Sequence, residues 1–268
     1  MNRTAEDEVL HRIDNGVSWI TLNRPEAMNA VTWDQRERVI ALLAEASADP
    51  AVRAVVVTAT GKGFCAGADL RGAPAAPAGE RVAGDVARMI RLGAQRLITA
   101  VLDCEKPVVA AVNGTAAGIG AHLALACDLV IAAEPARFIE VFVRRGLVPD
   151  GGGAYLLPRL IGPQKAKELM FFGDALPAAE AERLGLVNKV VPAEALEETA
   201  REWAERLAQG PTRALAMTKQ LVNASLDSDR ATALAAEATA QELNMTTADA
   251  NEGVASFVER RTPKYLGR

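Results

Sequence analysis

The sequence predicts an α/β fold in which one layered core is followed by a helical region. Short apolar runs typical of buried strands alternate with helical patterns up to about Gly151, and helices dominate beyond it. Such alternation is typical of an α/β layered core. A chain of 268 residues is long enough for one domain with an appendage. We place the boundary near residue 195, with 1–195 as the core and 196–268 as the C-terminal helical region.

The first elements are predicted to be a β-hairpin and a capped helix. The β-like runs 9–14 and 17–22 are separated by Asn15-Gly16, the dipeptide favoured in type I′ turns. Thr32 and Gln35 then form a capping-box pattern, which predicts that a helix begins there.

Three later apolar runs are expected to be strands covered on both faces, at residues 54–58, 107–112 and 128–133. A helix is expected from about Glu80 to Asp103, and residues 187–191 are the only strand candidate after Gly151. Further helices are predicted at 192–209, 211–225, 230–244 and near 252–261.

Composition excludes several classes of protein. The net charge of −4 gives no basic footprint for nucleic acid. We see no signal peptide and no apolar run near the roughly 18 residues that span a membrane, so we expect a cytoplasmic protein without a membrane partner. Three widely spaced cysteines and two histidines predict neither disulfides nor a metal site.

Two glycine-rich loops, 61–70 and 112–122, each follow a predicted buried strand. Their small residues leave the backbone bare, and the second loop opens a helix whose free N–H groups suit a developing anion. Two such amides converging on one oxygen would form an oxyanion hole. The alternative is that the glycines only permit tight turns. Gly118 and Gly120 also begin a dinucleotide fingerprint, but Leu123 replaces its third glycine.

Six motifs in order resemble the crotonase (enoyl-CoA hydratase/isomerase) superfamily. They lie at residues 23–25, 63–70, 109–129, 146–153, 185–187 and 252–257. Their pattern is most similar to the phenylacetate-pathway epoxide/enoyl-CoA isomerase-like members. The resemblance implies a crotonase-type spiral of ββα units with a C-terminal helical region that assembles a homotrimer or a dimer of trimers.

The resemblance also implies an acyl-CoA substrate, with coenzyme A present as part of the thioester and no tightly bound cofactor. The N–H groups of Ala68 and Ile119 would form the oxyanion hole. The residues implied along the substrate and its coenzyme A are Arg24, Ala27, Ala66, Asp69, Leu70, Gly118, Phe142, Phe257 and Lys264.

The acid–base residues depart from those of the best-known relatives. The two glutamates of hydratases would fall at His122 and Phe142, and neither position is a carboxylate. Asp150 remains, and isomerase-type relatives carry an aspartate at the matching place. One base can remove a proton and return it two carbons away. We therefore expect an enoyl-CoA isomerase, or an epoxide/oxepin-type isomerase, using Asp150, unless Asp150 only caps a helix.

Three alternatives stay open at this point. The protein could be a hydratase using His122 with Asp150, a non-catalytic acyl-CoA binding protein, or an enzyme of other enolate chemistry such as hydrolysis or decarboxylation. His122 could hold water, act as a second acid, donate a hydrogen bond or be structural. Glu140 is expected to point away from the pocket, and Cys65 to be a packing residue. Arg144 and Arg145 are expected to be solvated or salt-bridged.

Overall fold

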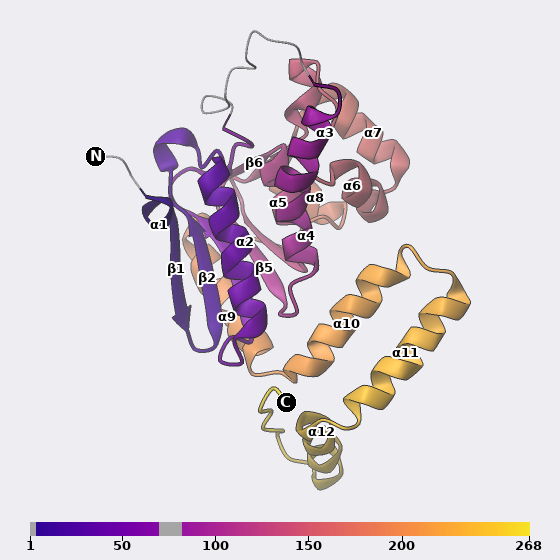
Figure 1. The fold of residues 1–268 in the computed structure, drawn as a ribbon. Coiled ribbons are helices and arrows are strands. Elements are labelled where there is room, and N and C mark those ends of the chain that lie inside the picture. Colours follow the sequence, from indigo (N-terminus) through magenta and orange to yellow (C-terminus); the bar gives the residue numbers. More distant parts are fainter. Residues whose placement is uncertain (1–3, 70–81) are drawn as a thin grey trace.

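Two β-sheets form the centre of the computed structural model, which describes residues 4–69 and 82–268 (Figure 1). The larger sheet has the order β1-β2-β3-β5-β7-β10. β1 and β2 pair antiparallel, and the other neighbours pair parallel. Its strands are β1 (Val9–Asp14), β2 (Val17–Leu22), β3 (Ala54–Ala59), β5 (Val108–Val112), β7 (Leu129–Ala133) and β10 (Lys189–Val191).

The smaller sheet has the order β4-β6-β8-β9, with only β9 antiparallel to its neighbour. Its strands are β4 (Gly63–Cys65), β6 (Thr115–Ala117), β8 (Arg137–Ile139) and β9 (Ala175–Pro177). Each of β3, β5 and β7 in the large sheet is followed by one strand of the small sheet and then by helix. This alternation is the predicted spiral of ββα units.

Local signals explain the first elements. Asn15 and Gly16 have φ values of 50° and 76°, as a type I′ turn requires, and join β1 to β2. Helix α2 (Trp33–Ala48) begins at the predicted capping box. The Gln35 N–H donates to Thr32 Oγ1 at 3.2 Å, and the Thr32 N–H donates to Gln35 Oε1 at 3.0 Å.

Both faces of the large sheet are covered, as its continuous apolar strands predicted. Along β3, Val55 and Val57 join the main core, whereas Ala54 and Val56 face the second core beneath α9 (Leu196–Ala208). Successive strand residues point to opposite faces, so an unbroken apolar run can supply two cores at once.

The long helix predicted from Glu80 to Asp103 is observed as α3 (Asp85–Ile90) and α4 (Arg96–Leu102) with a π-helical turn, Arg91–Gln95, between them. The sequence did not predict that turn. Gly93 lies within it, and a Cβ there would come within 2.5 Å of Arg36 Nη1. The Arg36 side chain of α2 therefore lies close against this turn, and its flexible end would have to shift to admit a Cβ.

The last helices agree with the predicted ranges to within a few residues: α9, α10 (Thr212–Ser225), α11 (Arg230–Asn244) and α12 (Ala248–Glu259). α5 (Ile119–Leu125) is the helix expected after the second glycine-rich loop. No range was predicted for α1 (Ala5–Glu8), α6 (Gly153–Ile161), α7 (Pro163–Phe172) or α8 (Ala178–Arg183). The prediction of a single strand after Gly151 was wrong, because β9 precedes β10. None of the helices in the two described ranges is long and apolar enough to cross a bilayer.

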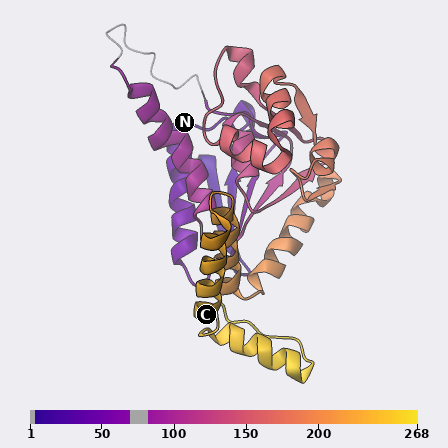
Figure 2. The ribbon, with the colours of Figure 1, turned by 90° about the vertical axis from the view of Figure 1, so that its right-hand side faces the viewer.

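The C-terminal helices leave the layered core. α9 packs on the large sheet, and α10 is held to the core by a salt bridge of 2.9 Å between Lys219 Nζ and Asp128 Oδ2. α11 has no buried residue, and Figure 1 shows α11 and α12 outside the two sheets, with α12 below them in Figure 2 as well. The domain boundary near residue 195 stays a prediction.

Candidate active site

Pairing within the small sheet brings the two glycine-rich loops together. β4 and β6 run parallel with Cys65 opposite Ala116, so the loops that follow them leave side by side. Gly67 has a φ of 105°, and a Cβ there would lie 3.2 Å from the Ala117 carbonyl oxygen. A Cβ at Gly120 would lie 2.3 Å from the Cys65 carbonyl oxygen. The loops touch through their backbones, and glycine is required for that contact.

The amides of Ala68 and Ile119 donate no hydrogen bond within residues 4–69 and 82–268, as is also true of Gly67, Gly120 and Ala121 in these loops. The Asp69 N–H donates to the Val31 carbonyl and the Gly118 N–H to the Ile139 carbonyl, each at 2.9 Å. Ile119 is the first residue of α5, where amides have no partner within the helix. Two unpaired donors on touching loops could stabilise an oxyanion.

The segment after Asp150 packs directly on α5. Gly151 has a φ of 54°, and a Cβ there would lie 2.3 Å from Ile119 Cδ1. A Cβ at Gly153 would lie 2.2 Å from His122 Nε2. Asp150 itself does not cap α6, whose N-cap is Gly152 and has no side-chain cap bond. The capping alternative for Asp150 is therefore not observed.

Burial and one neighbouring charge act on the Asp150 carboxyl in opposite directions. Burial raises its pKa because the charged form loses hydration, while the imidazole of His122 lowers it. Burial is the larger effect, so the pKa of Asp150 lies above its ordinary value.

His122 and Glu140 form a buried pair. The carboxylate oxygens of Glu140 lie 3.2 and 3.1 Å from His122 Nε2, and the side chains are 5% and 1% exposed. The imidazole also stacks on Phe142, with ring centroids 5.5 Å apart and planes at 11°. His122 Nδ1 is buried and has no hydrogen-bond partner in the described part of the chain.

The expectation that Glu140 points away from the site was wrong. Phe138 is buried in β8, and Glu140 follows it by two residues, so strand alternation turns both side chains inward. That period of two is the sequence signal that could have identified Glu140.

Several residues implied along coenzyme A gather at one cleft. Ala27, Ala66, Ala68 and Asp69 line a hollow of about 350 Å³, together with Arg145. Arg24 lies behind this cleft, where it donates to Asp69 Oδ2 at 2.9 Å and to the Ala30 carbonyl at 2.8 Å. Its guanidinium therefore links the Ala30 carbonyl to Asp69, at the end of the first glycine-rich loop. Leu70 lies outside the described residues.

Gly118 and Phe142 lie together beside α5, because a Cβ at Gly118 would come 3.5 Å from Phe142 Cζ. Phe257 and Lys264 are not brought to this place. Phe257 is 84% exposed on α12. This helix lies at the opposite end of the molecule from α5 and β6 (Figures 1 and 2). One chain alone does not unite all the implied residues.

The other expectations for charged and thiol groups agree with the structure. Arg144 and Arg145 are exposed and form no ion pair with residues 4–69 or 82–268. Burial raises the pKa of the Cys65 thiol to about 11, so Cys65 is a packing residue and not a thiolate nucleophile.

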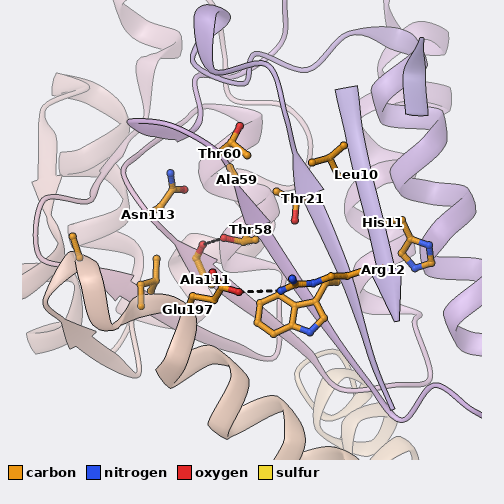
Figure 3. Close-up of a pocket in the computed structure, with 13 residues that line it drawn as sticks. Leu10, His11, Arg12, Thr21, Thr58, Ala59, Thr60, Ala111, Asn113 and Glu197 are labelled. Atoms are coloured by element: carbon orange, nitrogen blue, oxygen red, sulfur yellow. Dashed lines mark hydrogen bonds and ion pairs between the residues drawn. The ribbon is translucent and has the colours of Figure 1, made fainter. Parts of the chain in front are cut away.

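A second cavity, of about 440 Å³, lies on the face of the large sheet that α9 partly covers (Figure 3). Thr21, Thr58 and Asn113 point into it, and an ion pair of 3.0 Å between Arg12 and Glu197 closes one side. None of the residues implied for catalysis or coenzyme A lines this cavity.

Comparison with known families identifies the chain. A profile described as enoyl-CoA hydratase/isomerase matches residues 12–268. The chain belongs to the enoyl-CoA hydratase/isomerase family. Membership agrees with the crotonase resemblance read from the six motifs.

Individual relatives in this family carry different reaction names. The 1,2-epoxyphenylacetyl-CoA isomerase of Escherichia coli K12 is 37% identical over 260 residues, which cover 97% of this chain and 98% of the relative. The crotonyl-CoA hydratase of Syntrophomonas wolfei is 35% identical over 265 residues, covering 98% and 100%. A crystal structure of an enoyl-CoA hydratase/isomerase from Cupriavidus metallidurans superposes with a TM-score of 0.90 at 37% identity, covering 98% of this chain and 97% of that one.

Replacing Gly153 with alanine tests the contact between the Asp150 segment and His122. The new Cβ would collide with the imidazole, and overpacking of this kind typically costs about 1–3 kcal/mol of unfolding free energy. The same substitution in a His122→Ala background should cost far less, because the ring is gone. Urea denaturation of the four chains measures both costs. Equal costs in the two backgrounds would show that the glycine does not serve this contact.

Proposed function

We propose that the protein is an enoyl-CoA isomerase in which Asp150 is the catalytic base. The observation that carries the proposal is the place of its carboxyl: half-buried, directly before a glycine that packs on Ile119, and without a hydrogen bond or ion pair within the described ranges. Glu140, by contrast, is committed to His122. A base must be free to accept a proton, and Asp150 meets that requirement.

The proposed reaction begins at the thioester carbonyl. Its oxygen would accept hydrogen bonds from the Ala68 and Ile119 amides, which stabilise the enolate more than the substrate and so accelerate its formation. Asp150 would remove a proton from one carbon and return it to the carbon two positions away. Coenzyme A would lie along the cleft of Ala27, Ala66 and Asp69 as part of the substrate.

Two forms of isomerisation fit a single base, and they require different acyl groups. A 1,3 shift of a double bond needs only the single base. An epoxide-to-oxepin rearrangement is the second form, and it is supported by the likeness to the Escherichia coli enzyme, whose name specifies an epoxide. Hydration has less support, because His122 is buried and its Nε2 faces Glu140.

We also propose that the chain assembles as a trimer or a dimer of trimers. α11 has no buried residue, and Leu234 and Leu243 on it are exposed, as are Val254 and Phe257 on α12. Apolar surface of this extent is typical of an interface. Contact between copies would also allow Phe257 and Lys264 of one chain to approach the cleft of another.

Light scattering tests the assembly. The expected mass is about three or six times that of the 28.3 kDa chain. Leu234→Glu together with Leu243→Glu should reduce it, since each buries a charge in the interface. A monomer at micromolar concentration would contradict the proposal.

Replacing Asp150 with asparagine should abolish the isomerase activity while leaving acyl-CoA binding intact. The loss of a general base typically lowers the rate by about 10²- to 10⁴-fold. Asp174→Asn, at an exposed aspartate after α7, is the matched control. Since the base must be ionised and burial raises its pKa, kcat/KM of the parent enzyme should rise with pH through that raised pKa and fall below it.

A panel of enoyl-CoA and epoxyacyl-CoA esters decides among the alternatives. Retained turnover in Asp150→Asn would contradict the assignment of the base. Water addition to crotonyl-CoA, followed by loss of the enoyl thioester absorbance, would favour the hydratase. Tight binding without any turnover would indicate a non-catalytic protein.

Replacing Ile119 with proline tests the oxyanion amide. Proline removes the N–H, and the first position of a helix tolerates its ring. Loss of one oxyanion donor typically costs about 2.7–4 kcal/mol of transition-state stabilisation, or 10²- to 10³-fold in kcat. Ile119→Ala removes the side chain but keeps the amide, so it should retain most of kcat. Similar losses in both variants would assign the effect to packing.

A further inference from the structure

The second cavity has no part in the reaction described above, and it lies where three neighbouring parallel strands end (Figure 3). β2, β3 and β5 contribute Thr21, Thr58, Ala59 and Ala111 to its lining. α9 begins at Leu196, which also lines the cavity. A volume of about 440 Å³ is within the range of small-molecule sites, and such sites are common at the carboxyl ends of parallel strands.

The side-chain amide of Asn113 points into this cavity (Figure 3). Its Nδ2 donates to the Gly61 carbonyl at 2.8 Å and to the Gly63 carbonyl at 3.4 Å, which fixes the orientation of the amide. Asn113 Oδ1 is buried and has no hydrogen-bond partner in the described part of the chain, and the same is true of Nε1 of Trp19, another lining residue. Because an unpaired buried acceptor costs free energy, a ligand that donates to Oδ1 gains affinity.

Threonine hydroxyls continue the polar lining. Thr58 Oγ1 donates to the Ala111 carbonyl and Thr60 Oγ1 donates to Asn23 Oδ1, each at 2.9 Å, so both keep lone pairs that can accept. The Thr21 hydroxyl has no partner within residues 4–69 and 82–268. The lining therefore offers a free donor at Thr21 and acceptors at Thr58 and Thr60.

The charges along the wall of the cavity balance one another. Arg12 pairs with Glu197 at 3.0 Å, and Glu197 also pairs with Arg201 at 3.2 Å. His11 is the other titratable residue of the lining, and its pKa is lowered mainly by burial, so the imidazole is neutral at neutral pH. An uncharged ligand suits this wall better than an ion.

Thr21 and Asn113 mark the two ends of the polar lining. Thr21 lies opposite Thr58 in the β2–β3 pair, and the β3–β5 register places Asn113 two residues beyond the partner of Thr58. With strands about 4.8 Å apart and a rise of about 3.3 Å per residue, the Cα atoms of Thr21 and Asn113 are roughly 12 Å apart. A ligand that reaches both must be extended.

We propose that this cavity is a second small-molecule site, separate from the coenzyme A cleft, which takes an uncharged molecule with an amide group at each end. One amide N–H would donate to Asn113 Oδ1, and the carbonyl of the other amide would accept from the Thr21 hydroxyl. A planar amide supplies both a donor and an acceptor without a charge. Binding at this site does not depend on which residue is the catalytic base.

N-acetylglycinamide, an uncharged diamide, is the probe. Calorimetric titration of the intact protein should give a dissociation constant in the millimolar range, as expected for a ligand of so few atoms. N-acetylglycine carries a carboxylate at one end and lacks the terminal N–H donors, so it should bind about tenfold more weakly. Undetectable binding of the diamide at tens of millimolar, or equal affinity for the two compounds, overturns the proposal.

Two variants connect the affinity to the cavity. Thr21→Val replaces the free hydroxyl with a methyl group and should weaken diamide binding about 3- to 10-fold. Ala193→Phe, at an exposed position of the lining, should block the cavity and abolish binding. Thr99→Val, at an exposed threonine on α4, is the matched control and should bind as the parent does. Parent-like affinity in both cavity variants overturns the proposal.

A crystal soaked with the diamide shows where the probe lies. Diamide hydrogen-bonded to Asn113 Oδ1 and Thr21 supports the proposal. Diamide in the coenzyme A cleft only, binding at crystal concentration only, or a cavity that keeps ordered water in place of the probe overturns it.

Discussion

The site depends on backbone-to-backbone contact between the two loops of the small sheet. A Cβ at Gly114 would lie 2.0 Å from the Lys62 carbonyl oxygen, and one at Gly120 would lie 2.3 Å from that of Cys65. Strands of three residues have few ladder hydrogen bonds to set their spacing, so this close packing determines how near the loops approach. Any side chain at either glycine would separate β4 from β6, and the amides of Ala68 and Ile119 would move apart with them.

The same constraint places the carboxyl group. Gly151 and Gly153 allow the main chain after Asp150 to lie against α5, and the contact involves no hydrogen bond of the Asp150 side chain in the described residues. Position is thus supplied by the backbone, and the carboxyl keeps its capacity to accept a proton. The cost is partial loss of hydration, which raises the pKa of Asp150, and the imidazole of His122 offsets part of that rise.

Local signals in the sequence predicted most of the large sheet and its helices. Asn15-Gly16 defined the hairpin, and Thr32 with Gln35 defined the start of α2. The small sheet was not predicted, because three residues show no periodicity and the partners Cys65 and Ala116 are far apart in the sequence. Family resemblance located the loops and Asp150 but directed attention to positions 122 and 142. The pair that His122 forms with Glu140 involves a residue outside that pattern, and only its spacing from Phe138 indicated that it is buried.

His122 and Phe142, at the two positions where hydratases carry glutamates, fit a site with one base. Two carboxylates close to Asp150 would repel its negative charge and raise its pKa beyond the effect of burial. Phe142 instead presents an apolar ring, and His122 presents a group that can carry positive charge. The nearby carboxylate, Glu140, is paired with that imidazole, its two oxygens lying 3.2 and 3.1 Å from Nε2. With Asp150 as the base, burial raises its pKa and the imidazole at position 122 offsets part of that rise, which favours the ionised carboxyl that a proton shift by a single carboxylate requires.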